Sequence, residues 1–357
     1  MAELNINSTT TTDLSSSVKE YSPDSANLDI AQEGKETTWD YPYSSMYLGY
    51  YKTIPELKKA IDALTSWTVG KGFIANPMTE IRTRHITGWG KDNFQTILEN
   101  MFVMMKVMGD SFAEVMRAES GTVINLKPIS AEVMRIVVDS KGMIKRYEER
   151  VGNKWTKYKS EDILHLCNER IGGEIHGNSV IEACKWALDA RNEAMRDHRQ
   201  VIHRNLVPVR IIEIDSENTT KINKMKNEYA QAIKKGEVLI IPKGTVEIKD
   251  AVINIQDPIT WIQYLENFIY IALGVPKIIM GGSEQFTEAG GKVGYLTFEQ
   301  VYSTEQRKLE IQLKDQLGLD LTFNRPVSLK DKEQSDEAKN TSQVGFQPND
   351  TQAGVGE

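Results

Sequence analysis

The sequence predicts an α+β fold between two flexible tails, and three observations support this organisation. Residues 111–166 contain runs with the two-residue alternation of strands, whereas the segments before and after them show the spacing of helices. Residues 1–40 and 326–357 have few large apolar groups and read as flexible tails. The length of 357 residues suffices for roughly two domains of about 150 residues each.

The charge balance argues against tight, general binding of nucleic acid. Lys and Arg number 43 and Asp and Glu number 50, which gives a net charge of −7. Proteins that grip phosphates usually carry a basic excess. Loose contact with nucleic acid inside an enclosed passage stays compatible with this charge.

Other features predict a cytoplasmic product. No apolar run approaches the roughly 18 residues of a membrane span, and the start MAELNINSTTTTDLSSS lacks the regions of a signal peptide. The two cysteines, Cys167 and Cys184, cannot form a disulfide framework, and we expect both to be reduced. Membrane insertion and secretion are therefore not expected.

Two helices are predicted before the strands. Thr53 is expected to cap a helix that has Pro55 in its first turn and ends at Gly70. Asp92 is expected to start a second helix with a methionine-rich face, closed by Gly109. We interpret the methionine face as core, because methionines at helical spacing are more often core than a binding surface.

The strand region reads as hairpins. Alternation in SFAEVMRAESGTVINLKPI breaks at Ser120-Gly121, and alternation in MRIVVDSKGMIKRYEER breaks around Ser140-Lys141-Gly142. The stretch WTKYKSEDILHLCN then ends in a short apolar run. Together with the helices, these strands predict one compact α+β unit.

A second, smaller unit is predicted from the following segment. A long helix from Ser179 to Asn205 loses its apolar face toward its end. The strand VPVRIIEID, a helix ending at Gly236, and the short strands EVLIIPKG and TVEIKDAVI come next. One face of that helix carries Ile222, Met225, Tyr229 and Ile233.

The clearest predicted helix start is Asp257-Pro258. This helix runs to Gly274 and is apolar on nearly every side, so we expect burial within the chain or between subunits. The glycine-rich loop GGSEQFTEAGGKVG follows, and a last helix is predicted from Tyr295 to Leu317.

No catalytic or cofactor motif is found. A phosphate-binding loop would need glycine and hydroxyl positions that Phe286 and Val293 occupy around Lys292. His165-Leu166-Cys167 is a single pair without a second cluster, so no metal site is predicted. We therefore expect neither an enzyme nor a cofactor, although carboxylates that converge only in the fold are not visible in a sequence.

Three segments, in order, resemble those of phage portal proteins, the ring-shaped vertex proteins of tailed double-stranded DNA viruses. A strand pair of that family is similar to the first segment, GDSFAEVMRAESGTVINLKPISAEVMRIVVDSKG. The family's entry into a long helix is similar to the second, DILHLCNERIGGEIHGNSVIEACKWAL, in which Gly177 and Ser179 occupy the "G-x-S" positions. The helix before the family's tunnel loop resembles the third, YLENFIYIALGVPKIIMGG. Each motif is weak alone, but their order over residues 45–323 is much more specific.

The resemblance implies a portal-like subunit with an α+β wing, two stem helices around a small α/β clip, and a tunnel loop leading into a long helix. Beyond Phe323 the chain is too short for a large folded crown, so none is expected. The implied divisions are an N-terminal arm (1–40), the wing (41–179), a stem helix (180–205), the clip (206–255), a second stem helix (256–274), the tunnel loop (275–294), a wing or crown-base helix (295–325) and a C-terminal tail (326–357).

The resemblance also implies partners and functional residues. The expected state is a homo-oligomeric ring of twelve subunits at a capsid vertex of the virion, which contacts the major capsid protein and passes double-stranded DNA through its channel. Ile222, Met225, Tyr229 and Ile233 would belong to the clip that docks the large terminase and the head–tail adaptor. The residues expected to line the channel are Glu284, Gln285, Phe286, Thr287, Glu288 and Lys292.

Two other functions remain open at this point. One is a nucleic-acid-processing enzyme whose site is not visible in the sequence, and the other is a different ring-forming head–tail connector. Connectors of the second kind are generally shorter and do not need a helix–clip–helix order. The size of the particle and the absence or presence of hydrolysis would separate these alternatives.

Overall fold

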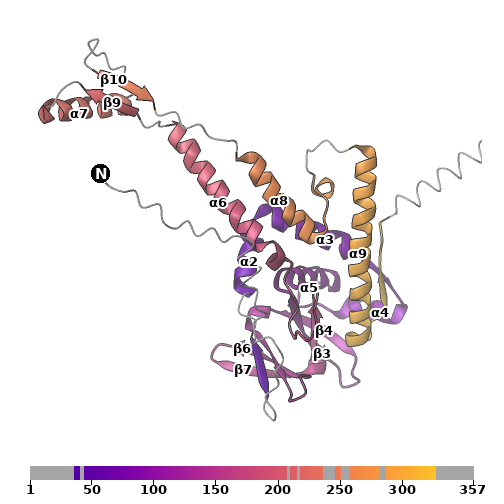
Figure 1. Ribbon diagram of the computed structural model, residues 1–357. Helices are drawn as coiled ribbons and strands as arrows, with labels where there is room; N and C mark the ends of the chain where they lie inside the picture. Colours follow the sequence, from indigo (N-terminus) through magenta and orange to yellow (C-terminus); the bar gives the residue numbers. More distant parts are fainter. Residues whose placement is uncertain are drawn as a thin grey trace, which may run out of the picture. The chain divides into compact units, whose positions relative to one another are not determined.

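The α+β prediction is confirmed by a computed structural model of the chain (Figure 1). The structure describes residues 36–40, 44–206, 210–214, 218–235, 246–250, 258–281 and 287–326. The chain divides into a larger unit, made from residues 1–187 and 266–357, and a smaller unit of residues 188–265. Both predicted tails lie almost entirely outside the described residues.

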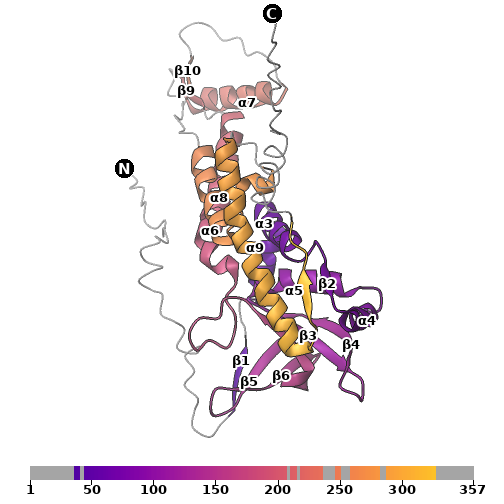
Figure 2. The same ribbon diagram turned by 90° about the vertical axis from the view of Figure 1, so that its right-hand side faces the viewer.

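Two antiparallel sheets and the helix α5 form the layers of the larger unit. Helix α5 packs on the three-stranded sheet of order β4-β3-β8, and the four-stranded sheet of order β1-β5-β6-β7 lies on the other side (Figures 1 and 2). Both predicted hairpins, β3–β4 and β5–β6, are confirmed. The strands are β1 (Thr37–Asp40), β3 (Asp110–Arg117), β4 (Val123–Ile129), β5 (Met134–Val138), β6 (Ile144–Val151), β7 (Lys154–Lys159) and β8 (Ile163–Cys167), with short 3-10 turns η1 (Ala131–Val133) and η2 (Ser160–Asp162) between them.

Helix α5 (Phe94–Met108) forms the core, as its sequence predicted. Its cap is Asn93 rather than Asp92: the Asn93 side chain accepts a hydrogen bond from the Thr96 N–H at 2.8 Å, and the Thr96 hydroxyl accepts one from the Asn93 N–H at 3.2 Å. This reciprocal capping box satisfies two backbone donors at once, which Asp92 has no means to do from one position earlier. The methionines at 101, 105 and 108 are buried, which confirms the core interpretation.

The predicted cap at Thr53 is wrong. Thr53 ends an earlier helix, α2 (Ser44–Thr53), and its hydroxyl donates to the Gly49 carbonyl at 2.8 Å. Helix α3 (Pro55–Thr68) has Ile54 at its cap position, without a side-chain hydrogen bond. Ile54 is buried, so packing sets this junction instead of a polar cap.

The last helix, α9 (Glu288–Leu317), packs across the larger unit. Trp67 of α3 lies with its ring centroid 5.7 Å from Tyr295, 5.6 Å from Phe298 and 5.7 Å from Tyr302 of α9. At the far end, the Gln316 side chain forms two hydrogen bonds with the backbone of His165 in β8, at 3.0 and 2.9 Å. The remaining elements of this part are α4 (Pro77–His85) and the paired strands β2 (Phe73–Ala75) and β11 (Leu321–Phe323).

A buried ion pair links α9 to α5. The Lys106 ammonium lies 2.7 Å from the Glu305 carboxylate and donates to the Asn168 side-chain oxygen at 2.7 Å. Burial lowers the pKa of Lys106, although the attraction of Glu305 opposes this shift. Burial would raise the pKa of Glu305, but Lys106 outweighs it and the pKa lies below its ordinary value.

The smaller unit contains the predicted strand–helix–strand order. Strands β9 (Arg210–Ile214) and β10 (Val246–Asp250) pair antiparallel, with Val246 opposite Ile214, and α7 (Thr219–Lys235) lies between them in sequence. The two long helices at its edges are α6 (Val180–Leu206) and α8 (Ile259–Leu273). The strand predicted at residues 237–244 falls outside the described residues.

Helix α8 is buried on one face only. Ile262, Leu265, Ile269 and Leu273 are buried, whereas Trp261, Tyr264 and Ile271 are 48, 52 and 74% exposed. The chain alone therefore does not provide the burial on most sides that the sequence predicts. Within the part of the chain that the structure describes, no helix is long and apolar enough to span a membrane.

We predict that Lys106→Met destabilises the protein by about 3 kcal/mol. Removing one member of a buried ion pair leaves the other charge uncompensated, and such losses are about 3–5 kcal/mol. We expect the lower end, because Glu305 still contacts Lys308 at 3.0 Å. Urea denaturation of the full chain, followed by tryptophan fluorescence, measures the change.

The matched control is Lys58→Met. Lys58 forms an exposed pair with Asp62 at 2.7 Å, and such pairs contribute about 1 kcal/mol or less. Equal losses in the two variants would show that burial of the Lys106 pair is not what stabilises the unit.

Candidate functional site

The segment between α8 and α9 contains the residues that the family resemblance implies line a channel. Helix α8 ends at Gly274, which has φ +62°, and the Val275 N–H bonds the Tyr270 carbonyl at 3.1 Å. A short 3-10 turn, η3 (Lys277–Met280), follows and stops at Gly281 with φ +82°. The first part of the predicted loop is therefore ordered as a turn.

The predicted extent of this loop, residues 275–294, is too long. Helix α9 starts at Glu288, seven residues before the predicted Tyr295. Thr287 caps it, because its hydroxyl accepts a hydrogen bond from the Gly290 N–H at 3.2 Å. Three of the five glycines that suggested a loop, Gly290, Gly291 and Gly294, lie within the first two turns of this helix.

Close packing accounts for one of these glycines. A Cβ on Gly291 would lie 3.1 Å from the Ile278 Cδ1 atom of η3, which is tighter than an ordinary contact, whereas one on Gly294 would make an ordinary contact 3.7 Å from Pro276. At Gly291, therefore, the small size of glycine matters more than its conformational freedom.

The structure describes part of the predicted channel set. Thr287 caps α9, Glu288 is its first residue, and Lys292 lies exposed in its second turn. Glu284, Gln285 and Phe286 lie outside the described residues, as does the side chain of Glu288.

The predicted clip face lies on α7. Asn218 starts this helix by accepting a hydrogen bond from the Thr220 N–H at 3.0 Å. Met225 and Tyr229 are half-buried, Ile222 is 36% exposed, and the side chain of Ile233 lies outside the described residues. The spacing indicates one shared face, and its role as a docking surface stays a prediction.

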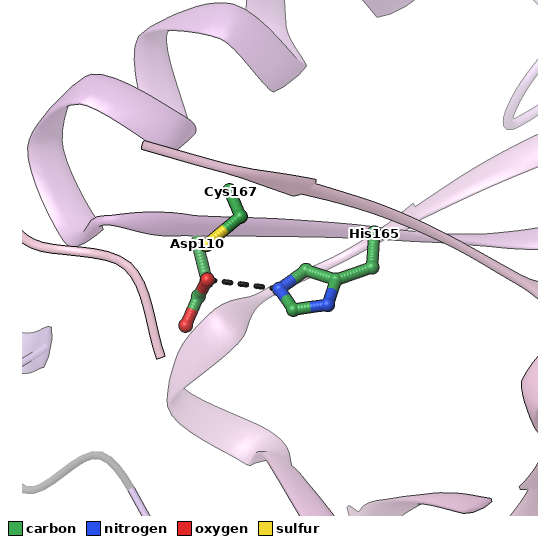
Figure 3. Close-up of side chains that lie close together, drawn as sticks. All are labelled: Asp110, His165 and Cys167. Atoms are coloured by element: carbon green, nitrogen blue, oxygen red, sulfur yellow. Dashed lines mark hydrogen bonds and ion pairs between the residues drawn. The ribbon is translucent and has the colours of Figure 1, made fainter. Parts of the chain in front are cut away.

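A third group of side chains lies between the two sheets of the larger unit. The sequence analysis did not predict this group. Strands β3 and β8 place Asp110 opposite Cys167 and Phe112 opposite His165. Figure 3 shows the side chains of Asp110, His165 and Cys167 close together. Residues that face each other, or lie two apart, in adjacent antiparallel strands share a face. The register therefore brings a carboxylate, an imidazole and a thiol together.

Asp110 accepts hydrogen bonds from three directions. His165 Nε2 lies 2.8 Å from one carboxylate oxygen, and the Gly177 N–H donates to the same oxygen at 3.0 Å. His176 Nδ1 lies 2.7 Å from the other oxygen. Burial alone would raise the pKa of Asp110, but the two histidines outweigh it and the pKa lies well below its ordinary value.

The other members of this group are also held in place. The Tyr147 hydroxyl of β6 lies 3.1 Å from His165 Nδ1, and the Phe112 ring stacks on His165 with centroids 4.6 Å apart. Burial, helped by the Asp110 charge, raises the pKa of the Cys167 thiol to about 12. Sequence reasoning found His165 and Cys167 as a pair but not Asp110, because pairing of β3 with β8 joins strands that are not neighbours in the chain.

Comparison with known proteins gives one family. The family model described as "Phage portal protein" matches residues 90–293, more than half of the chain. No curated protein matches the chain.

Solved structures match in fold. A chain from the neck of a native GTA particle, computed with C12 symmetry, aligns with a TM-score of 0.69 at 16% identity over 89% of this chain and 94% of that chain. A chain from the virion of a native gene transfer agent particle aligns with a TM-score of 0.69 at 15% identity over 91% and 96%. An HK97 family phage portal protein from Corynebacterium diphtheriae aligns with a TM-score of 0.53 at 13% identity over 84% and 98%.

We predict that Thr287→Val loosens the first turns of α9. Loss of a cap costs about 1 kcal/mol, so amide hydrogen exchange over residues 288–294 should accelerate about five-fold. Mass spectrometry of the exchanged full chain reads this out. Thr297→Val is the control, because the Thr297 hydroxyl bonds the Val293 carbonyl at 3.0 Å inside the same helix and caps nothing. If the amides of residues 288–294 exchanged at the rate of an unfolded chain in the unaltered protein, the start of α9 at Glu288 would be contradicted.

Proposed function

The chain belongs to the phage portal protein family, and from this premise we propose that its copies form a ring at one vertex of a viral capsid. Double-stranded DNA passes through this ring during packaging and ejection. The observation that carries the proposal is the family match, which runs without a break from before α5 to the second turn of α9.

The number of subunits in the proposed ring is twelve. The C12 symmetry belongs to the GTA neck whose chain shares this fold, and it supports the same number here. An exposed apolar face on α8, with Trp261 and Tyr264 stacked at 5.6 Å between centroids, offers a surface that a neighbouring subunit would cover.

The proposed channel suits the charge of the chain. A net charge of −7 disfavours firm binding of phosphates, and a conduit needs DNA to slide. We place residues 284–288 and Lys292 at the channel wall, where Lys292 provides the basic group and Glu284 and Glu288 limit how firmly phosphates are held.

The smaller unit would be the docking platform of the ring. The strand–helix–strand segment of β9, α7 and β10 is the clip in this proposal, and its α7 face would contact the large terminase and the head–tail adaptor. The larger unit would contact the major capsid protein. The chain itself would carry no enzymatic activity, since the terminase would supply the energy of packaging.

Negative-stain microscopy of the purified full chain tests the proposal directly. We expect closed rings with a central channel and no hydrolysis of DNA by the purified protein. Monomers at micromolar concentration, or cleavage of DNA, would instead favour a nucleic-acid-processing enzyme.

We predict that Lys292→Glu leaves ring assembly unchanged and impairs DNA packaging about ten-fold or more. A negative charge at the channel wall would repel the phosphates that pass it. The measurement compares ring formation by microscopy with packaged DNA in a complementation assay.

Lys314→Glu is the matched control. Lys314 lies 22 residues later on α9, roughly 33 Å away along the helix, and pairs with Asp320 at 3.0 Å. Equal packaging by both variants and the unaltered protein would contradict the channel position of Lys292.

A further inference from the structure

The side chains between the two sheets contain a donor set that metals use. The ligand atoms of Asp110, His165 and Cys167 all lie within 4.8 Å of one another. A tetrahedral Zn²⁺ with bonds of about 2.0–2.3 Å holds its ligand atoms about 3.3–3.8 Å apart. His165 Nε2 and one Asp110 oxygen are hydrogen-bonded at 2.8 Å, so an ion would replace the proton of this bond and move these two atoms slightly apart. The Cys167 sulfur would move closer to both of them.

We propose that Asp110, His165 and Cys167 bind a zinc-like divalent cation in the larger unit. Oxygen, imidazole nitrogen and thiolate sulfur are the donors that Zn²⁺ prefers. The site is separate from the channel and the clip, and its role is to fasten β3 to β8.

The surroundings of the three residues orient them for this task. A metal on His165 Nε2 requires the ring proton on Nδ1, and the Tyr147 hydroxyl at 3.1 Å is placed to accept it. His176 holds the second oxygen of Asp110 at 2.7 Å. Ligands in metal sites are commonly held by such outer partners, whose loss weakens metal affinity about 10–100-fold.

Charge balance favours an ion at this position. Asp110 is 1% exposed and His165 is 8% exposed, so the site excludes most water. A divalent cation with one carboxylate and one thiolate has no net charge, which keeps the cost of burial low. Binding releases the Cys167 thiol proton, and any proton on His165 Nε2, to solvent.

Cobalt substitution tests the proposal on the full-length protein. Co²⁺ added to protein treated with chelator should bind at one ion per chain and show the visible and sulfur-to-cobalt charge-transfer bands of tetrahedral thiolate sites. Equimolar Zn²⁺ should displace it. Absence of the charge-transfer band in the unaltered protein would overturn the proposal.

The two cysteines of the chain provide a matched pair of variants. Cys167→Ser should abolish the charge-transfer band and weaken Zn²⁺ binding by at least about 100-fold, more than the loss of an outer partner. Cys184→Ser should change neither, because Cys184 is buried in α6 and its sulfur bonds backbone carbonyls at 3.4 and 3.6 Å. Identical spectra in the two variants would overturn the proposal.

A third variant keeps the test informative should Cys167→Ser fold poorly. Asp110→Asn keeps a hydrogen-bond acceptor beside His165 but removes the charge that the ion needs. We expect circular dichroism close to that of the unaltered protein and a loss of Co²⁺ affinity of at least about 100-fold. Unchanged affinity in a folded Asp110→Asn protein would contradict the assignment of Asp110 as a ligand.

Discussion

A buried lysine at the end of α5 holds three parts of the larger unit together. Lys106 reaches Glu305 on α9 and Asn168 just after β8, each at 2.7 Å. Isolated charges are very costly to bury, so this arrangement is stable only when all three groups are in place. The position of α9 on the sheets is thus coupled to the loop that leaves β8.

The same region explains why two glycines and a serine occur where they do. A Cβ on Gly109 would lie 2.1 Å from the Gly177 carbonyl oxygen, and one on Gly177 would lie 2.3 Å from the Gly109 carbonyl oxygen. Ser179 then donates its hydroxyl proton to the Val107 carbonyl. The "G-x-S" pattern at Gly177 and Ser179 therefore has a physical basis in the close approach of two backbones.

Local signals in the sequence predicted much of the fold. Hairpins at Gly121 and Gly142 and the methionine-rich helix were predictable, because turn residues and periodicity act over short distances. Three details were not predictable in this way. The cap at Asn93 depends on a reciprocal bond with Thr96, the early start of α9 depends on packing against η3, and burial of Ile54 sets the junction after α2.

Prediction of the candidate sites was limited by distance along the chain. His165 and Cys167 are two residues apart and were found together, whereas Asp110 is 55 residues from His165 and joins them only through the β3–β8 register. Pairings between strands that are not sequence neighbours leave no local signal. The channel and clip residues were proposed from the family resemblance, which indicates where such residues lie in the chain but not which atoms they contact.

Helix α9 is a long, uninterrupted helix that runs across the larger unit. Thirty residues at 1.5 Å each make it about 45 Å long. Its first turn follows the proposed channel wall, its middle is pinned at Glu305, and Gln316 at its far end grips the backbone of His165. Trp67 of α3 also packs on this helix between its first turns and Glu305, so a load on the first turns would be shared among contacts with α3, α5 and β8.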